Sequence, residues 1–128
     1  MPEHTTSPAG RLLIHAALPV GRSPSRLPLQ AIVSEEIGST SLYVGQQWLA
    51  PGDRVMLHTH PVEEALTFLA GSGEATLGAD VVPIAVGTSL YIPAGVVHGF
   101  RNTGEDSLHV MVVFPTPAFA ETTMVEQS

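Results

Sequence analysis

Glycine and proline recur along the whole chain so closely that few windows could hold a long helix. The 128 residues include 12 glycines and 11 prolines, and both residue types weaken helix interiors and favour turns. Between them lie short apolar runs such as 29–36, 40–50 and 107–114. About nine or ten short strands at this spacing are typical of an all-β sandwich or barrel. We therefore expect an all-β fold.

The length of the chain fits one domain. We expect this domain to span residues 11–118, with a flexible N-terminal tail at 1–10 and a C-terminal tail at 119–128. The run "EATLGADVVPIA" predicts a hairpin that turns at Gly78, Ala79 and Asp80.

Charge and composition exclude several classes of function. The net charge is −7, and an acidic surface repels phosphate backbones, so nucleic acid is not an expected partner. Lysine and cysteine are both absent, which excludes Schiff-base chemistry, thiolate metal sites, cysteine nucleophiles and disulfides. The first residues contain no long apolar run, so we expect no signal peptide, no membrane span and a cytoplasmic location.

Two histidines stand one residue apart in the stretch "GDRVMLHTHPVEEALTFLAG". Alternate residues of a strand face the same side, so His58 and His60 point together. Glu64 follows the turn at Pro61 and falls near the start of the next strand. Two imidazoles and a carboxylate on adjacent strands can converge on a metal ion, and His98 is available as a further ligand.

The spacing of these residues resembles that of the cupins. Gly52, His58, His60, Glu64 and Gly71 reproduce the first cupin motif. Gly87, Pro93, Gly95, His98 and Asn102 reproduce the second motif. The resemblance implies a double-stranded β-helix, or jelly-roll barrel, with one metal ion held by His58, His60, Glu64 and His98.

Three neutral imidazoles and one carboxylate suit divalent Fe, Mn, Ni, Co, Cu or Zn, and the ligands alone do not select among these metals. Four protein ligands leave one or two open positions for a substrate or dioxygen.

Strand alternation also predicts the lining of the pocket. The residues in phase with the ligands are Met56, Leu66, Phe68, Val96, Phe100, Val110 and Val112. For the strand at 40–50 the pattern leaves both faces open, and similarity to other small cupins favours Tyr43 and Gln47.

A mostly apolar pocket around an open metal site suits a small, weakly polar or aromatic organic substrate. The resemblance to quercetinase-like cupins implies dioxygenase or other oxidoreductase chemistry. The alternatives are a non-oxidative cupin metalloenzyme, such as a decarboxylase, isomerase or lyase, and a metal-containing module that binds or senses a small ligand without turnover.

By elimination, Glu64 is the expected catalytic base, with Tyr43 and Tyr91 as the next candidates. We also expect a homodimer, because small cupins usually pair through their sheets. The apolar run at 11–20 would form an edge strand that needs a partner.

Overall fold

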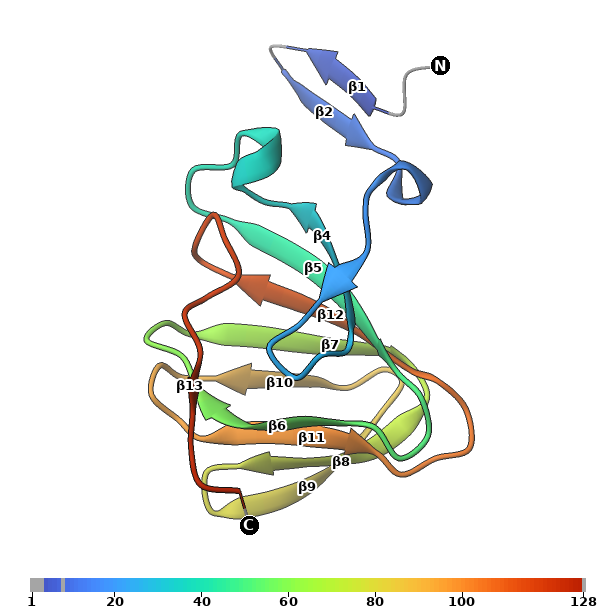
Figure 1. Ribbon diagram of the computed structural model, residues 1–128, viewed down its shortest axis with the longest axis vertical. Helices are drawn as coiled ribbons and strands as arrows, with labels where there is room; N and C mark the ends of the chain where they lie inside the picture. Colours follow the sequence, from blue (N-terminus) through green and yellow to red (C-terminus); the bar gives the residue numbers. More distant parts are fainter. Residues whose placement is uncertain (1–3, 8, 128) are drawn as a thin grey trace.

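The computed structural model describes residues 4–7 and 9–127, which fold into a barrel of two facing antiparallel sheets (Figure 1). The larger sheet has the strand order β10 (Ser89–Ile92), β7 (Glu64–Ala70), β12 (Leu108–Phe114), β5 (Tyr43–Leu49), β4 (Pro28–Val33) and β3 (Gly21–Arg22). The smaller sheet has the order β13 (Thr123–Met124), β6 (Arg54–Thr59), β11 (His98–Asn102), β8 (Ser72–Leu77) and β9 (Asp80–Ala85). The prediction of an all-β jelly-roll barrel is confirmed.

Among the residues that the structure describes, helical structure is limited to short turns. The two 3₁₀ helices, η1 (His15–Ala17) and η2 (Glu35–Ile37), are three residues long each. Within the described part of the chain, no helix has the length and apolar character needed to cross a membrane.

The core lies between the two sheets and follows from the alternation of apolar residues along the strands. In β12, Leu108, Val110, Val112 and Phe114 are all 0% exposed, and the residues between them are half-buried. Phe68 of β7 packs edge-to-face against Phe100 of β11 across the barrel, with ring centroids 5.5 Å apart. The hydrophobic contacts therefore join the two sheets directly.

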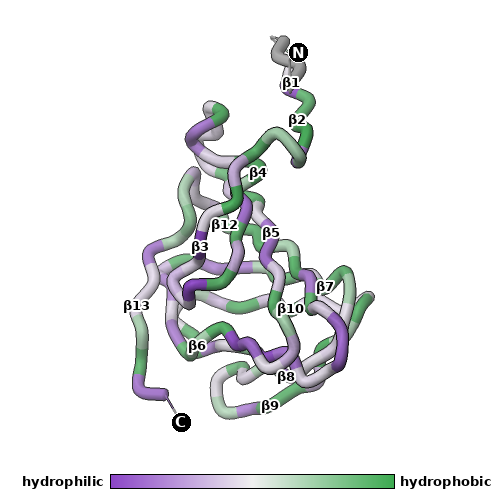
Figure 2. The backbone as a smooth tube through the Cα atoms, turned by 45° about the vertical axis from the view of Figure 1, so that its right-hand side comes forward, coloured by the Kyte–Doolittle hydropathy of each residue, from purple (hydrophilic) through white to green (hydrophobic). Residues whose placement is uncertain are grey.

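The hairpin expected around residue 79 is present, since β8 and β9 pair in register from Ser72–Ala85 to Leu77–Asp80. The expectation that residues 11–20 form one edge strand is wrong. Only β2 (Gly10–Leu13) of that run is extended, and it pairs with β1 (His4–Ser7) in a separate sheet. This hairpin projects from the barrel (Figure 2).

The C-terminal segment crosses the barrel (Figure 1). It includes β13, which pairs with β6 through Thr123–Thr59 and Met124–His58. Beyond β13, the Gln127 side chain bonds both the amide and the carbonyl of Leu57 at 2.8 Å. Residues 119–127, which the sequence assigns to a tail, therefore contact the barrel wall.

Two motif glycines have a geometric role. Gly71 has φ +85°, and a Cβ there would lie 2.5 Å from the Ser107 carbonyl oxygen. Gly95 has φ +80°, and its amide donates a 2.8 Å hydrogen bond to the carbonyl of His60. Glycine reaches this conformation without a steric penalty. The hydrogen bond from Gly95 links the turn before β11 directly to His60, one of the candidate ligands.

The outer face of the larger sheet carries a polar network. Gln46 Nε2 donates to Gln30 Oε1 at 2.7 Å, and Gln30 Nε2 donates to the carbonyl oxygens of His15 and Leu18. His109 Nε2 lies 2.7 Å from Gln46 Oε1. The segment around η1 therefore covers this face and satisfies its two buried glutamines.

Candidate metal centre

Four side chains from three parts of the fold converge inside the barrel. His58 and His98 are directly paired across β6 and β11, Glu64 begins β7 in the opposite sheet, and His60 lies in the connection between β6 and β7. All four are buried, with 2–6% exposure. One ligand atom from each residue lies within 4.8 Å of every other. The structure thus brings together the four residues predicted from the spacing of the motifs.

Main-chain carbonyl oxygens orient the three imidazole rings. The Nδ1 atoms of His58, His60 and His98 lie 2.6, 2.9 and 3.0 Å from the carbonyl oxygens of Met56, Glu121 and Val96, respectively. A carbonyl oxygen only accepts hydrogen bonds, so each Nδ1 carries the ring proton. Each neutral ring therefore directs an unprotonated Nε2 into the site, which is the arrangement of metal-binding histidines.

The short distances between the inward atoms fit a cation. His58 Nε2 lies 3.0 Å from His60 Nε2, and His98 Nε2 lies 2.8 Å from Glu64 Oε1. These atoms are all acceptors in the orientation described, so they repel each other unless a proton or a metal ion lies between them. Ligands about 2.1 Å from a first-row ion stand about 3.0 Å apart at right angles. These two distances match that geometry, and the distance from His60 Nε2 to Glu64 Oε1 is longer, at 3.6 Å.

Burial favours the neutral form of the rings. Desolvation lowers the pKa of His58 from 6.5 to about 4, and the nearby rings of His98 and His60 lower it further against the opposing hydrogen bond to Met56. Desolvation also lowers the pKa of His60. Both rings are thus neutral at pH 7 and need not lose a proton to bind a metal ion.

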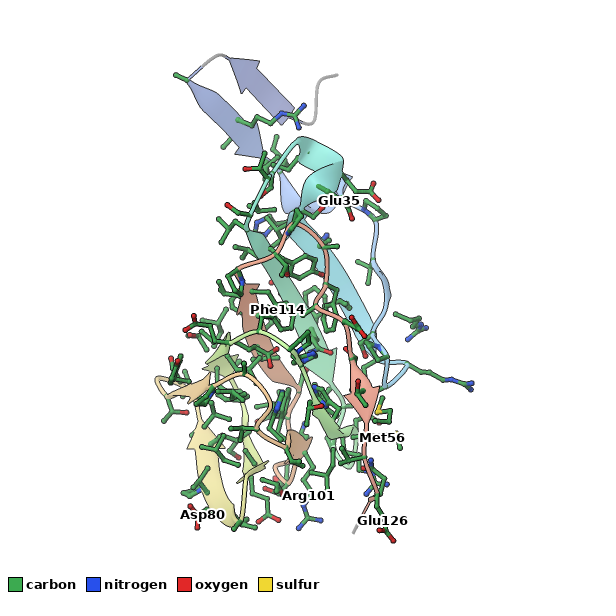
Figure 3. The ribbon with its side chains drawn as sticks, turned by 90° about the vertical axis from the view of Figure 1, so that its left-hand side faces the viewer. Glu35, Met56, Asp80, Arg101, Phe114 and Glu126 are labelled. Carbon is green, nitrogen blue, oxygen red and sulfur yellow. The ribbon has the colours of Figure 1, made fainter. Side chains whose placement is uncertain are left out.

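A β-bulge in β6 changes which residues face the site. Phe100 pairs with Val55 and His98 pairs with His58, so β6 has one more residue than β11 between these two pairs. Val55 therefore points inward with His58 and is 9% exposed. The expectation that Met56 lines the pocket does not hold, because simple alternation fails at a bulge. Figure 3 places Met56 beside β13, at the outside of the barrel.

A small cavity adjoins three of the four residues, His58, Glu64 and His98. It offers about 20 Å³ of free space, enough for one water-sized group. Of the predicted pocket residues, Gln47, Leu66 and Phe100 line it. Phe68, Val110 and Val112 point inward but belong to the packed core. The half-buried Val96 contributes its carbonyl to His98 and also packs against the core.

Tyr43 faces inward, as expected, but it lies away from this cavity. Its ring packs against Phe114 and Phe119, with centroids 5.9 and 5.6 Å away. Burial raises the pKa of Tyr43 to about 12. Tyr91, the other tyrosine considered as a base, is 62% exposed. Neither tyrosine is placed to act beside the four converging residues, while Glu64 lies among them.

Sequence reasoning missed the contribution of two chain segments. The C-terminal segment supplies Phe119, Thr122 and Met124 to the cavity wall. The loop at 23–25 supplies Ser23, Pro24 and Ser25. Neither segment carries a motif or an alternation pattern that indicates an inward position. Their roles depend on how the chain crosses the barrel mouth.

Comparison with known proteins agrees with this geometry. The sequence model of the cupin domain family matches residues 46–114, which include all four converging residues. The protein SchB of Streptomyces halstedii is 39% identical over 69 residues, which cover 53% of this chain and 50% of SchB. The polyketide synthase protein CurC of Streptomyces cyaneus is 30% identical over 87 residues, with coverage of 64% and 56%. The chain thus spans about half the length of these curated relatives.

The fold is also found among solved structures. The polyketide cyclase RemF of Streptomyces resistomycificus superposes with a TM-score of 0.75 and 19% identity. The match covers 89% of this chain and 84% of RemF. At this level of identity the likeness concerns the fold.

Proposed function

Because this chain belongs to the cupin family, we propose that it is a metal-dependent enzyme that acts on a small, weakly polar or aromatic organic substrate. The observation that carries the proposal is the convergence of His58, His60, Glu64 and His98, whose inward atoms are spaced as the ligands of one divalent ion. Three nitrogen donors and one oxygen donor suit a first-row transition metal. When bound, such a metal polarises an oxygen of the substrate or activates dioxygen.

The surroundings of the four residues favour an apolar substrate. Leu66, Phe100 and Phe119 form much of the cavity wall. No arginine lies along this wall, so the described part of the site offers no cationic partner to a phosphate group. A phenol, an enol or a related organic oxygen ligand matches this combination of an apolar wall and a metal site.

Dioxygenase or other oxidoreductase chemistry is the first candidate reaction. The site offers few protein groups able to carry out acid–base steps, so the bound metal would supply most of the reactivity. Within the protein, Glu64 is the group placed to take a proton from a ligand at the metal. The main-chain bonds to Nδ1 hold the three rings in place during this step.

A non-oxidative reaction is the second candidate, and the relatives favour it. CurC is described as a polyketide synthase protein, and RemF is a polyketide cyclase. Ring closure of a polyketide needs a base that removes a proton beside a carbonyl group and a cation that stabilises the resulting oxyanion. Glu64 and a bound metal would provide both, without consuming dioxygen.

Two measurements separate these candidates. Elemental analysis of the purified protein should give about one transition-metal ion per chain. The protein loaded with Fe(II) is then supplied with phenolic and polyketide-type substrates in an oxygen electrode. Oxygen uptake that matches substrate loss supports the oxidoreductase, whereas product formation without uptake supports the cyclase type. Metal binding without any turnover would contradict both enzyme proposals and favour a ligand-binding module.

We also infer that the protein is a cytoplasmic homodimer. The β1–β2 hairpin extends from the barrel (Figure 1), and Leu12 and Ile14 are 59% and 39% exposed. A two-stranded hairpin by itself is at best marginally stable in water. Packing of this hairpin on a second copy of the chain would bury its apolar side chains.

A further inference from the structure

Gln47 carries a buried polar atom without a partner in the protein. The residue lies in β5 and is 4% exposed. Among the described residues, Gln47 Oε1 is the one buried side-chain nitrogen or oxygen that lacks a hydrogen bond. A buried acceptor in this state destabilises the fold, so its presence needs a physical reason.

The position of Gln47 in the sheet explains why the protein offers no donor. Its cross-strand neighbours are Leu29 of β4 and Val110 of β12, which are both apolar. The adjacent Gln46 makes an instructive contrast, because it faces the other side of β5. Gln46 is bonded at both ends of its amide, to Gln30 and to His109. The fold thus satisfies one of two consecutive glutamines and leaves the other unpaired.

Gln47 lines the same cavity as His58, Glu64 and His98. None of these three groups can donate to it at neutral pH. The ring protons of the two histidines are engaged by the carbonyl oxygens of Met56 and Val96, and the carboxylate of Glu64 only accepts. The three hydroxyl-bearing residues of the wall, Ser23, Ser25 and Thr122, make no hydrogen bond to Gln47 Oε1 either. Its donor therefore comes from a molecule in the cavity, either a water or a bound ligand.

We propose that Gln47 selects the ligand of the metal centre by accepting a hydrogen bond from it. The ligand class is an organic molecule that carries an O–H or N–H group next to the oxygen that meets the metal. Enols with a neighbouring hydroxyl group, vicinal diols of aromatic rings and hydroxamates have this pattern. This inference rests on the proposed metal-dependent function and adds a specificity-determining residue to it.

The effect follows from the loss of a buried partner. A ligand with a donor fills the open acceptor of Gln47, whereas a ligand that lacks one leaves that acceptor unpaired in a dry site. Sites that bond a ligand hydroxyl or amide discriminate strongly against analogues without that group. A single neutral hydrogen bond changes affinity by roughly tenfold.

The test uses two probes that bind metals through the same two oxygens. Acetohydroxamate carries an N–H group beside these oxygens, and N-methylacetohydroxamate carries a methyl group there. Both are titrated into Co(II)-loaded protein, and the visible absorption of Co(II) reports binding. The variant Gln47→Met keeps the length of the side chain but has no polar end. The matched control is Gln46→Met, at the next residue on the opposite face.

The wild type should bind acetohydroxamate at least roughly tenfold more tightly than the N-methyl probe. Gln47→Met should lose most of this preference and retain its Co(II). Because the two side chains are similar in size, any steric penalty of the methyl group remains the same in both proteins. Without metal or probe, Gln47→Met should melt at or above the wild-type temperature, since it removes an unpaired acceptor. Gln46→Met should melt lower and keep the probe preference.

Different outcomes separate this inference from the function on which it rests. A wild type that takes up no Co(II) overturns both. A wild type that loads Co(II) but binds the two probes equally overturns the role of Gln47 alone. The role of Gln47 is also overturned if Gln47→Met keeps the full preference, or if it melts as far below the wild type as Gln46→Met does.

Discussion

His58 Nε2 and His60 Nε2 face each other at 3.0 Å, while the Nδ1 atom of each ring lies against a main-chain carbonyl oxygen. The two lone pairs are therefore directed at one point before any ion is bound. The two rings approach this point from nearly perpendicular planes, at 73°. This preorganisation means that a metal ion would replace a repulsive contact between two acceptors with two bonds.

Replacing His60 with alanine tests the assignment of the ligands. We expect His60→Ala to lower metal affinity by at least about tenfold, because even the outer partners of metal ligands are worth that much. The barrel should still fold, since the core is formed by apolar residues such as Val112 and Phe114. Elemental analysis measures the metal, and far-UV circular dichroism measures the fold. The control His109→Ala removes a histidine outside the site and should keep full metal content.

Replacing Glu64 with glutamine separates its role as a base from its role as a ligand. An amide oxygen can still bind a metal ion, but it cannot take up a proton. Glu64→Gln should therefore lose turnover by about 10²–10⁴-fold and lose less of its metal. The rates are compared at equal metal occupancy. The exposed neighbour provides the control Glu63→Gln, which should leave the rate unchanged. Near-wild-type turnover of Glu64→Gln would place the base elsewhere.

The four ligand candidates could be found from the sequence because their positions follow from local rules. Alternate residues of a strand share a face, and short turns bring consecutive strands together. The bulge in β6 could not be found in this way, because it depends on pairing with β11. Alternation therefore selected Met56, whereas the structure directs Val55 inward.

The residues at the mouth of the barrel also could not be predicted from the sequence. Phe119 and Thr122 line the cavity. Their segment is held there by Glu121, whose carbonyl oxygen accepts a hydrogen bond from His60, about sixty positions earlier in the chain. The alternation of apolar residues along a strand does not predict that a distant segment passes over the barrel. The unpaired state of Gln47 also depends on the register of three strands, although its inward direction agrees with the expectation.

Removing the Phe119 side chain should open the cavity. This half-buried ring packs edge-to-face on Phe114, at 4.9 Å between centroids, and also lines the cavity beside the metal ligands. The free space of about 20 Å³ is too small for an aromatic substrate, so this part of the wall must move when one enters. Phe119→Ala should speed the binding of a bulky ligand in stopped-flow experiments.

The same variant should cost stability. Loss of a buried phenylalanine destabilises by about 3–5 kcal/mol, and a half-buried one should cost less. Phe119→Leu keeps most of the volume and serves as the control for both measurements. Unchanged binding rates in Phe119→Ala would mean that ligands enter by another route.

A charge on the N-terminal hairpin should disrupt the proposed dimer. Leu12 is 59% exposed in β2, so Leu12→Asp removes apolar area without disturbing the core. If the hairpin packs on a partner, this variant should be monomeric at micromolar concentration, as measured by light scattering. The control Val86→Asp introduces the same change at a residue of similar exposure, 63%, in the turn after β9. If light scattering shows that the wild type is a monomer, the proposal of a dimer is wrong.

The single tryptophan of the chain provides a pH probe away from the metal centre. Trp48 and His109 stack with ring centroids 5.3 Å apart and an angle of 7° between planes. Burial lowers the pKa of His109 from its usual 6.5. The ring is therefore mostly neutral at pH 7, and the midpoint of its protonation in the folded protein lies below pH 6.5.

Protonation of His109 should quench the emission of Trp48, since a charged imidazole quenches a stacked indole. The midpoint of this quenching in the folded protein should lie below pH 6.5. Because the unfolded chain binds this proton first, the free energy of unfolding should also fall as the pH drops below about 6.5. It should not fall as the pH rises above that value. His109→Gln should remove the fluorescence transition. A transition centred above pH 6.5 in the wild type would contradict the burial effect and indicate that the stacked indole stabilises the charged ring instead.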